Sequence, residues 1–415
     1  MSVLLKKSPA LTDTSISLPS SKSESNRALV IKAYSHSTIS LSNLSPARDT
    51  RTMLRLLDED PDVYDVLDAG TTMRFLTAFC AVMGKKKLLT GTDRMKERPI
   101  GLLADALRHL GADISYEGQK GYPPLRTNGF DRDSLVHEVS IRGDVSSQFI
   151  SALLMAGPVL PVGLTLKLTD KIGSRPYIDM TLALMNRFGA TAMWESNDVV
   201  RVLPTGYSGG SYEIESDWSG ASYWYSLMAI ARNGRLLLKG LRDVSMQGDR
   251  EIANIMEKLG VHSSFTNEGV VLTPGPEPDP KQALEIDFTG CPDLAQTVAV
   301  TCTALGIKCT MNGVESLRIK ETDRIKALQQ EIEKTGESRL YAISDTTCVL
   351  QPGEVRLPEK PLFINTYDDH RMAMAFAPLS VLMPLEIEDP AVTAKSYPDF
   401  WKDFESAGIS LTFNQ

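Results

Sequence analysis

Basic side chains gather near the starts of six expected helices. A helix N-terminus presents unpaired backbone N–H groups and the positive end of the helix dipole, so it favours anions. Arginine can form bidentate hydrogen bonds with phosphate or carboxylate, and lysine adds a compact positive charge. The pattern therefore predicts small ligands that carry several negative charges. The basic residues concerned are Lys22, Arg27, Arg94, Lys96, Arg98, Arg175, Lys320, Arg324, Arg371 and Lys395.

Two carboxylates stand among these cations. Asp293 opens the apolar run 294–305, and Glu321 lies between Lys320 and Arg324. A carboxylate in such a place can simply pair with its cations. It can also act as a positioned acid or base, and two such groups with opposite protonation suit a reaction that moves protons. The local sequence leaves both roles open.

The composition narrows the class of function. The chain has 415 residues, with 44 Lys and Arg against 52 Asp and Glu and a net charge of −8. An acidic chain is a poor nucleic-acid or anionic-membrane binder. Neither G-x-x-x-x-G-K-[ST] nor G-x-G-x-x-G occurs, which disfavours an ATP-driven or dinucleotide enzyme. The five cysteines include no C-x-x-C pair, so we expect no disulfide framework, no metal and no cofactor.

Targeting and membrane signals are weak in this chain. Residues 1–10 lack the apolar core of a signal peptide. The most apolar stretch, 149–166, is interrupted by Pro158 and Pro161, so we expect a buried helix followed by a strand rather than a membrane span. We therefore expect a cytoplasmic protein.

Two series of motifs recur along the chain. Five amphipathic segments end in a glycine, at positions 111, 189, 260, 336 and 408, which are 71 to 78 residues apart. Glycine adopts positive φ without strain, so each marks the end of a helix. Between them, short polar motifs open continuously apolar helices 73 to 76 residues apart, and Ser23 opens a similar helix after a shorter interval. These motifs begin at Gly70, Ser146, Ser219, Asp293 and Asp369.

The recurrence predicts six α/β units, the first abbreviated. A helix that is apolar on every side is expected to be buried on every side. Six units exceed one hydrophobic core, so we expect three plus three, with the Gly-rich stretch 204–211 as the hinge. The alternative is an α/β chain with regularly spaced elements and no true repeat.

Seven motifs resemble those of the 5-enolpyruvylshikimate-3-phosphate (EPSP) synthase family. The octapeptide RMKERPIG at 94–101 is highly specific, and the motifs follow in order from about residue 18 to about residue 400. The others are LPSSKSESNR at 18–27, VSSQF at 145–149, SMQGD at 245–249, RIKETDR at 318–324, DHRMAM at 369–374 and KSYPD at 395–399.

The resemblance implies a two-domain α/β fold of the enolpyruvyl transferase type. Each domain would hold three βαβαββ units around buried central helices. Residues 21–215 would form the N-terminal domain, and residues 1–20 with 216–415 the C-terminal domain, the first strand crossing back. The family's active site lies in the cleft between domains.

The resemblance also implies an activity. The family transfers the enolpyruvyl group of phosphoenolpyruvate to the 5-hydroxyl of shikimate 3-phosphate and releases phosphate, a step of the shikimate pathway towards chorismate and aromatic amino acids. The reaction proceeds by addition and then elimination through a tetrahedral intermediate. Its partners are these two small molecules, and we expect no nucleic acid, no membrane and a monomer.

The family's site residues map onto matching positions of this sequence. Asp293, Glu321 and Lys22 are the implied catalytic residues. The implied contacts of shikimate 3-phosphate are Lys22, Ser23, Arg27, Ser146, Ser147, Gln148, Ser174, Tyr177, Asp293 and Lys320. Those of phosphoenolpyruvate are Lys22, Gly70, Arg94, Gln148, Arg324, Arg371 and Lys395.

Some positions depart from the family pattern. Asp68 and Phe75 replace a frequent asparagine and proline around Gly70, and Ser316 replaces a frequent asparagine. Ala69-Gly70 resembles the class that glyphosate inhibits, so we expect inhibition.

Three other functions compete with this expectation, and the acidic balance of the chain argues against one of them, a nucleic-acid-binding protein. The sister transferase that acts on UDP-N-acetylglucosamine carries a reactive cysteine on a loop, whereas the matching stretch 88–98 has none and Cys80 lies in an apolar run. A catalytically inactive scaffold is the third alternative, and the retention of Lys22, Asp293, Glu321 and Arg371 argues against it.

Overall fold

The structure, a computed structural model, describes residues 1–414, in which helices and strands alternate as expected for an α/β chain. They form two units, each described by itself below. Unit 1 comprises Met1–Ser20 and the chain from Glu215 onward, and unit 2 comprises Ser21–Ile214.

The helices and strands of unit 2 follow one another in short connections. Its helices are α1 (Lys22–Tyr34), α2 (Arg48–Glu59), α3 (Gly70–Val82), α4 (Asp93–Lys96), α5 (Gly101–His109), α6 (Ser147–Ala156), the 3-10 turn η1 (Gly157–Val159) and α7 (Arg175–Arg187). Its strands are β3 (Ile39–Ser42), β4 (Val63–Asp65), β5 (Lys87–Thr90), β6 (Ala112–Tyr116), β7 (Leu125–Phe130), β8 (Glu138–Arg142), β9 (Leu164–Thr169), β10 (Ala192–Trp194), β11 (Val199–Val202) and β12 (Gly210–Glu213).

Unit 1 is built in the same manner. Its helices are α8 (Trp218–Ala231), α9 (Ile252–Glu257), α10 (Ala295–Leu305), α11 (Arg324–Lys334), α12 (His370–Phe376) and α13 (Phe400–Ser406), with 3-10 turns η2 (Gly248–Glu251), η3 (Pro292–Leu294), η4 (Glu315–Ile319), η5 (Ala377–Val381) and η6 (Pro390–Lys395). Its strands are β1 (Ser2–Leu5), β2 (Thr14–Ser17), β13 (Leu236–Lys239), β14 (Val261–Phe265), β15 (Gly269–Pro274), β16 (Leu284–Asp287), β17 (Cys309–Asn312), β18 (Arg339–Ala342), β19 (Thr347–Gln351), β20 (Leu362–Ile364), β21 (Leu385–Glu388) and β22 (Leu411–Asn414).

The sheets repeat one pattern of pairing. Within residues 1–414, five sheets have four strands each, in which one parallel pair is extended by two antiparallel pairings. The remaining sheet, in unit 2, holds only the parallel pair β12 and β3. The first of the six sequence repeats, which contains β3, is therefore abbreviated as expected. The stretch 204–211, expected as a hinge, lies inside unit 2 and leads into β12.

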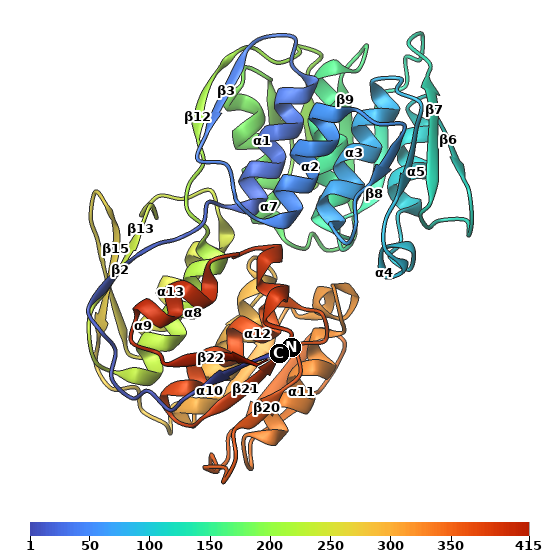
Figure 1. Ribbon diagram of the computed structural model, residues 1–415. Helices are drawn as coiled ribbons and strands as arrows, with labels where there is room; N and C mark the ends of the chain where they lie inside the picture. The colour runs from blue at the N-terminus through green and yellow to red at the C-terminus, as the bar shows by residue number, and fades with distance from the viewer. Residues whose placement is uncertain (415) are drawn as a thin grey trace. The chain divides into compact units, whose positions relative to one another are not determined.

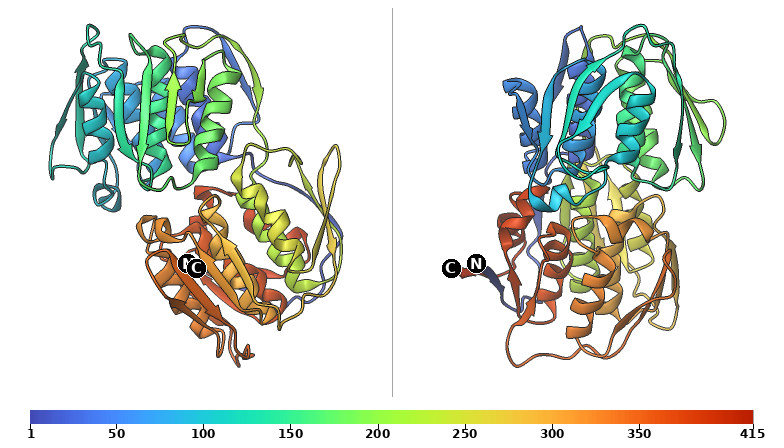
Figure 2. Two further views of the ribbon diagram at one scale, coloured as in Figure 1. Left: turned by 180° about the vertical axis from the view of Figure 1, so that it is seen from behind. Right: turned by 90° about the vertical axis from the view of Figure 1, so that its right-hand side faces the viewer.

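Both N-terminal strands complete sheets of unit 1. β2 pairs parallel with β13, and β1 lies antiparallel between β21 and β22. The first and last strands of the chain therefore lie side by side, with both termini at the same end of that sheet (Figures 1 and 2).

The continuously apolar helices are buried, as predicted. In unit 2, α3 packs against α1 and α6, and in Figure 1 α1, α2 and α3 run side by side. In unit 1, α10 packs against α8 and α12, and their apolar side chains form one core. The stretch 149–166 contains the buried end of α6, η1 and the start of β9, so the prediction of a helix and a strand is confirmed.

The five glycines that recur along the sequence adopt the expected backbone conformation. The φ angles of Gly111, Gly189, Gly260, Gly336 and Gly408 lie between 81° and 147°. Gly111, Gly189 and Gly408 each follow the residue that caps a helix, so the chain turns there towards the next strand or segment.

Candidate active site

The starts of α11 and α12 and the turn η3 meet around one buried arginine in unit 1. Arg324 is 2% exposed and begins α11. Its Nε donates to Asp369 Oδ2 at 2.7 Å, one terminal nitrogen donates to Asp293 Oδ1 at 3.0 Å, and the other to Glu321 Oε2 at 2.9 Å. Because a single planar guanidinium holds all three carboxylates, it fixes their mutual positions.

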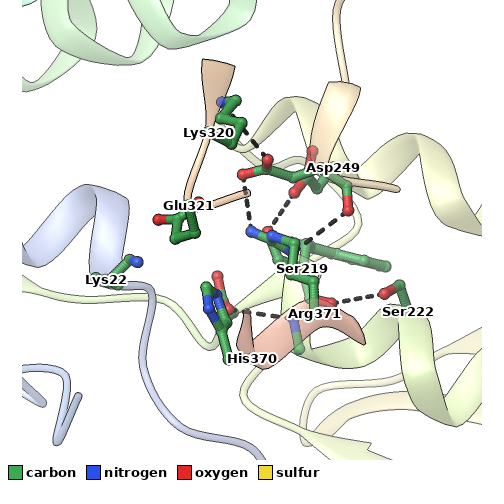
Figure 3. Close-up of polar contacts among 12 residues, drawn as sticks. Lys22, Ser219, Ser222, Asp249, Lys320, Glu321, His370 and Arg371 are labelled. Atoms are coloured by element: carbon green, nitrogen blue, oxygen red, sulfur yellow. Dashed lines mark hydrogen bonds and ion pairs between the residues drawn. The ribbon is translucent and has the colours of Figure 1, made fainter. Parts of the chain in front are cut away.

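Three further cations surround these carboxylates. Arg371 donates to Asp293 Oδ2 at 2.7 Å, Lys395 Nζ lies 3.3 Å from Glu321 Oε1, and Lys320 Nζ lies 3.7 Å from Asp293 Oδ1. In Figure 3, Lys320 and Glu321 come from the segment that precedes α11, and Arg371 comes from the start of α12. The charged cluster, as we call it, comprises Asp293, Lys320, Glu321, Arg324, Asp369, Arg371 and Lys395.

Local capping explains why these residues converge. Asp323 caps α11 by accepting a hydrogen bond from the N–H of Lys326 at 3.1 Å, which leaves Arg324 in the first turn. Asp369 caps α12 by accepting from the N–H of Arg371 at 2.9 Å. The carboxylate of Asp369 therefore both caps α12 and binds Arg324.

The electrostatics of the cluster favour charged side chains. Burial raises the pKa of Asp293, but Arg371, Lys320 and Arg324 outweigh burial and hold it well below its usual range. Burial lowers the pKa of Arg324, whereas Asp369, Glu321 and Asp293 together raise it beyond its usual value. Burial lowers the pKa of Lys320 despite the nearby Asp293. Asp293 is consequently ionised and weakly basic until its cations are neutralised by other anions.

A further buried carboxyl group, Asp249, lies close to Asp293. Asp249 belongs to η2, is 3% exposed and accepts a short hydrogen bond from Ser219 Oγ, as Figure 3 shows. Burial, and secondly the charge of Asp293, raise the pKa of Asp249 to about 7. Asp249 therefore keeps its proton in the folded protein over a range where an exposed aspartate is ionised.

Asp249→Asn is expected to remove a pH-dependent loss of stability. Because the pKa of Asp249 in the folded state is about 7 and its ordinary value is about 4, its contribution to stability is complete below about pH 4 and is lost as pH rises through about 7. The melting temperature of the wild type should fall relative to that of Asp249→Asn over this range. Thermal unfolding at a series of pH values measures the difference. The exposed Asp243→Asn serves as control, and a difference that does not vary with pH contradicts the assignment.

In unit 2, the predicted residues of α1 are tied to neighbouring helices. Lys22 Nζ lies 3.2 Å from Asp49 Oδ2. Arg27 is 2% exposed, and its guanidinium donates to Thr181 Oγ1 on α7 at 2.7 Å and to Ser151 Oγ on α6 at 3.1 Å. Burial lowers the pKa of Arg27 to about 10. The guanidinium thus links the middle of α1 to α6 and α7.

The remaining predicted residues of unit 2 lie at helix starts, and all but one are buried or partly buried. Gln148 Nε2 donates to Thr71 Oγ1 at 2.9 Å, which brings the start of α6 to the start of α3 beside Gly70. Ser146 caps α6, Ser147 begins it, and Ser174 caps α7, on which the carbonyl of Tyr177 accepts from Arg27 at 3.4 Å. The exception is Arg94, which is exposed on the short helix α4 and pairs with Glu97 at 2.9 Å.

Two polar residues of the site region were not singled out from the sequence. Asp369 opens a recurrent motif, but nothing in the sequence shows that its carboxylate binds Arg324, 45 residues away. Asp49 lies in α2 between ordinary polar residues, and its carboxylate, which contacts Lys22, is buried. In the sequence, the signal that could have identified Asp369 was its place at an expected helix cap directly before His370 and Arg371.

Two features bear on cofactors and membranes. Among residues 1–414, no group of three or more His, Cys, Asp and Glu side chains is placed to hold a metal ion. In the same part of the chain, no helix is both long and apolar enough to cross a membrane.

Comparison with known proteins identifies the family. The profile of EPSP synthase (3-phosphoshikimate 1-carboxyvinyltransferase) matches residues 56–404. The chain is 45% identical over 408 residues to the 3-phosphoshikimate 1-carboxyvinyltransferase of Bacteroides fragilis, covering 98% of each chain. It is 35% identical over 424 residues to the enzyme of that name from Yersinia pseudotuberculosis, covering 95% of this chain and 96% of the other. The fold matches EPSP synthase from Acinetobacter baumannii over 100% of both chains, with a TM-score of 0.77 and 19% identity.

The α/β architecture and these relatives define an enzyme with small-molecule substrates. The chain belongs to the EPSP synthase family. The prediction of a shikimate-pathway transferase is thereby confirmed, and the UDP-N-acetylglucosamine transferase is not favoured. Burial also raises the pKa of Cys80 to about 12, which does not suit a reactive thiolate.

Proposed function

We propose that the charged cluster catalyses the transfer of the enolpyruvyl group of phosphoenolpyruvate to the 5-hydroxyl of shikimate 3-phosphate, with release of phosphate. The observation that supports this most directly is that Arg324 holds Asp293 and Glu321 on one guanidinium. Two carboxylates at fixed positions among cations suit a reaction in which one group takes a proton while another gives one.

In the addition, each of the two carboxyl groups makes one proton transfer. Glu321 protonates the methylene carbon of phosphoenolpyruvate, and Asp293 removes the proton of the 5-hydroxyl, whose oxygen then bonds to C2. In the tetrahedral adduct, the C2–O bond to phosphate breaks as Glu321 takes a proton back from the new methyl group, which restores the double bond, and the proton held by Asp293 passes to the departing phosphate. Lys22, Arg94, Arg324 and Lys395 stabilise the negative charge that develops and leaves with phosphate.

The charges of the cluster explain how a weakly basic Asp293 can act. In the free protein, Arg371, Lys320 and Arg324 hold its pKa well below the usual range, although burial opposes them. The phosphate and carboxylate groups of the substrates bring negative charges to the same cations. Neutralising those cations raises the basicity of Asp293. Substrate binding itself therefore prepares the base.

The ligand contacts divide by substrate as the family motifs imply. We assign the shikimate 3-phosphate contacts to Lys22, Ser23, Arg27, Ser146, Ser147, Gln148, Ser174, Tyr177, Asp293 and Lys320. We assign the phosphoenolpyruvate contacts to Lys22, Gly70, Arg94, Gln148, Arg324, Arg371 and Lys395. A charge-assisted hydrogen bond contributes about 1.5–3 kcal/mol, so several are needed to hold each anion.

Phosphate release tests the proposed reaction. The purified protein is given phosphoenolpyruvate with shikimate 3-phosphate in one sample and with UDP-N-acetylglucosamine in another. We expect release with shikimate 3-phosphate alone. Release with the sugar nucleotide, or no release from folded protein in either sample, overturns the proposal. A monomeric state and a cytoplasmic location remain predictions, and sedimentation of the protein tests the first.

Gly70→Ala is expected to weaken phosphoenolpyruvate binding without unfolding the protein. Gly70 begins α3, and an added Cβ would lie 2.7 to 2.9 Å from the guanidinium of Arg98. Arg98 is a long side chain that can move away, so the melting temperature should change little. Its displacement, together with the methyl group at the helix start, should raise KM for phosphoenolpyruvate by about tenfold. Steady-state kinetics measure this change, and an unaltered KM contradicts the placement of Gly70 in the site.

A further inference from the structure

The loop that leads into α12 has an unusual backbone. Residues 365–369 connect β20 to α12, and both Tyr367 and Asp368 have φ of 55°. Such values are unfavourable for residues other than glycine, asparagine and aspartate, so they persist only where the surroundings hold them. Tyr367 belongs to none of these three types, so its conformation, two residues before Asp369, calls for specific anchoring.

A buried glutamate of α11 provides that anchoring. Glu331 is 0% exposed, and its carboxylate accepts hydrogen bonds from the N–H of Asn365 at 3.1 Å and from the hydroxyl of Tyr367 at 2.5 Å. Lys334 Nζ lies 2.6 Å from the same carboxylate and balances its charge. The loop is therefore held at two of its first three residues by one side chain.

The loop is linked to the catalytic groups at its other end. Asp369 caps α12 beside Arg371 and accepts from Arg324 Nε at 2.7 Å. Arg324 and Glu331 belong to the same helix, seven residues apart, which corresponds to about two turns. α11 thus contacts both ends of the 365–369 loop, through Glu331 at residue 365 and through Arg324 at residue 369. The position of the loop determines where Asp369 and α12 lie.

We propose that Glu331 and Tyr367 are positioning residues for enolpyruvyl transfer: by holding the 365–369 loop, they place Asp369 against Arg324 and direct Arg371 towards phosphoenolpyruvate. This inference rests on the proposed function. Neither residue touches the reacting groups. Both act through the arginines that we assign to phosphoenolpyruvate, so a loss of either should affect that substrate more than shikimate 3-phosphate.

Tyr367→Phe tests the proposal with a minimal change. The substitution removes only the hydroxyl, so the protein should keep its melting temperature. Misplacement of Arg371 and Arg324 should raise KM for phosphoenolpyruvate by about tenfold, while the Kd of shikimate 3-phosphate stays within about twofold of wild type. The matched control is Tyr225→Phe in the same unit, whose hydroxyl bonds to Ser263 Oγ at 3.0 Å.

Variants of Glu331 provide a second, graded test. Glu331→Gln keeps one oxygen that can accept from the N–H of Asn365, and its amide nitrogen can donate to the hydroxyl oxygen of Tyr367, so it should retain most of the affinity for phosphoenolpyruvate. Glu331→Ala removes both bonds and should resemble or exceed Tyr367→Phe.

The outcomes separate this inference from the proposed function. If wild type and Tyr225→Phe release phosphate and Tyr367→Phe has the same KM as they do, the positioning role is wrong. It is equally wrong if Glu331→Ala lowers only the melting temperature. If wild type itself transfers nothing, the proposed function fails first, and the positioning role fails with it.

Discussion

Asp293→Asn is expected to lower the turnover number by about 10²- to 10⁴-fold, the range for loss of a positioned acid or base. Asparagine has the shape of aspartate, and its oxygen can still accept from Arg371 or Arg324, which bind the carboxylate at 2.7 Å and 3.0 Å. The amide cannot take a proton from the 5-hydroxyl. Steady-state phosphate release measures the loss.

The binding of shikimate 3-phosphate distinguishes a chemical defect from a misfolded site. Calorimetric titration of Asp293→Asn should still detect this ligand, because the cations that bind its phosphate remain. The control is Asp243→Asn, which changes a carboxylate that also pairs with an arginine, Arg250 at 2.6 Å, but on the surface. Turnover of Asp293→Asn within about threefold of this control would exclude Asp293 as the base.

Arg324→Met should affect both stability and activity more than any other single substitution in the cluster. Its removal leaves the carboxylates of Asp369, Asp293 and Glu321 without their shared cation, and the Asp369 side chain is 0% exposed. Breaking a buried ion pair by removing one partner costs about 3–5 kcal/mol. Urea unfolding of the variant should therefore show a free energy of unfolding lower by that amount, and phosphate release should be abolished.

Two comparisons make this prediction specific. Arg250→Met removes an arginine from the exposed pair with Asp243 and should cost about 1 kcal/mol or less. Arg324→Lys keeps the charge but cannot bind three carboxylates at once, so it should fold better than Arg324→Met and remain poorly active. If Arg324→Met were as stable as Arg250→Met, the carboxylates would not depend on Arg324.

The elements that position the site follow from local sequence. Glycine at 111, 189, 260, 336 and 408 indicated turns because no other residue adopts positive φ so easily, and all five have it. The continuously apolar runs after Gly70, Ser146 and Ser219 predicted buried helices because no face of them suits water, and α3, α6 and α8 are buried. Helix starts rich in cations indicated anionic ligands, because the cations and the N–H groups of a helix start are close together in the sequence.

Motif resemblance predicted the family, which comparison with known proteins then confirmed. The repeat also predicted an abbreviated first unit. The strand pairing that completes the sheets was harder to predict from the sequence, because β1 and β2 join strands that lie hundreds of residues later in the chain. Strand partners depend on the whole topology, and local patterns carry little information about it.

The sequence by itself determined which residue types stand at the helix starts, where the helices end and which segments are buried, because these follow from short-range periodicity, capping and backbone preference. Only the tertiary structure decided that Arg324 holds Asp293, Glu321 and Asp369 together, that burial raises the pKa of Asp249 to about 7, and that Glu331 contacts the 365–369 loop. These properties arise from burial and from contacts between distant segments. The pKa of an ionisable side chain shifts from its ordinary value only when folding removes the side chain from water and brings distant partners to it.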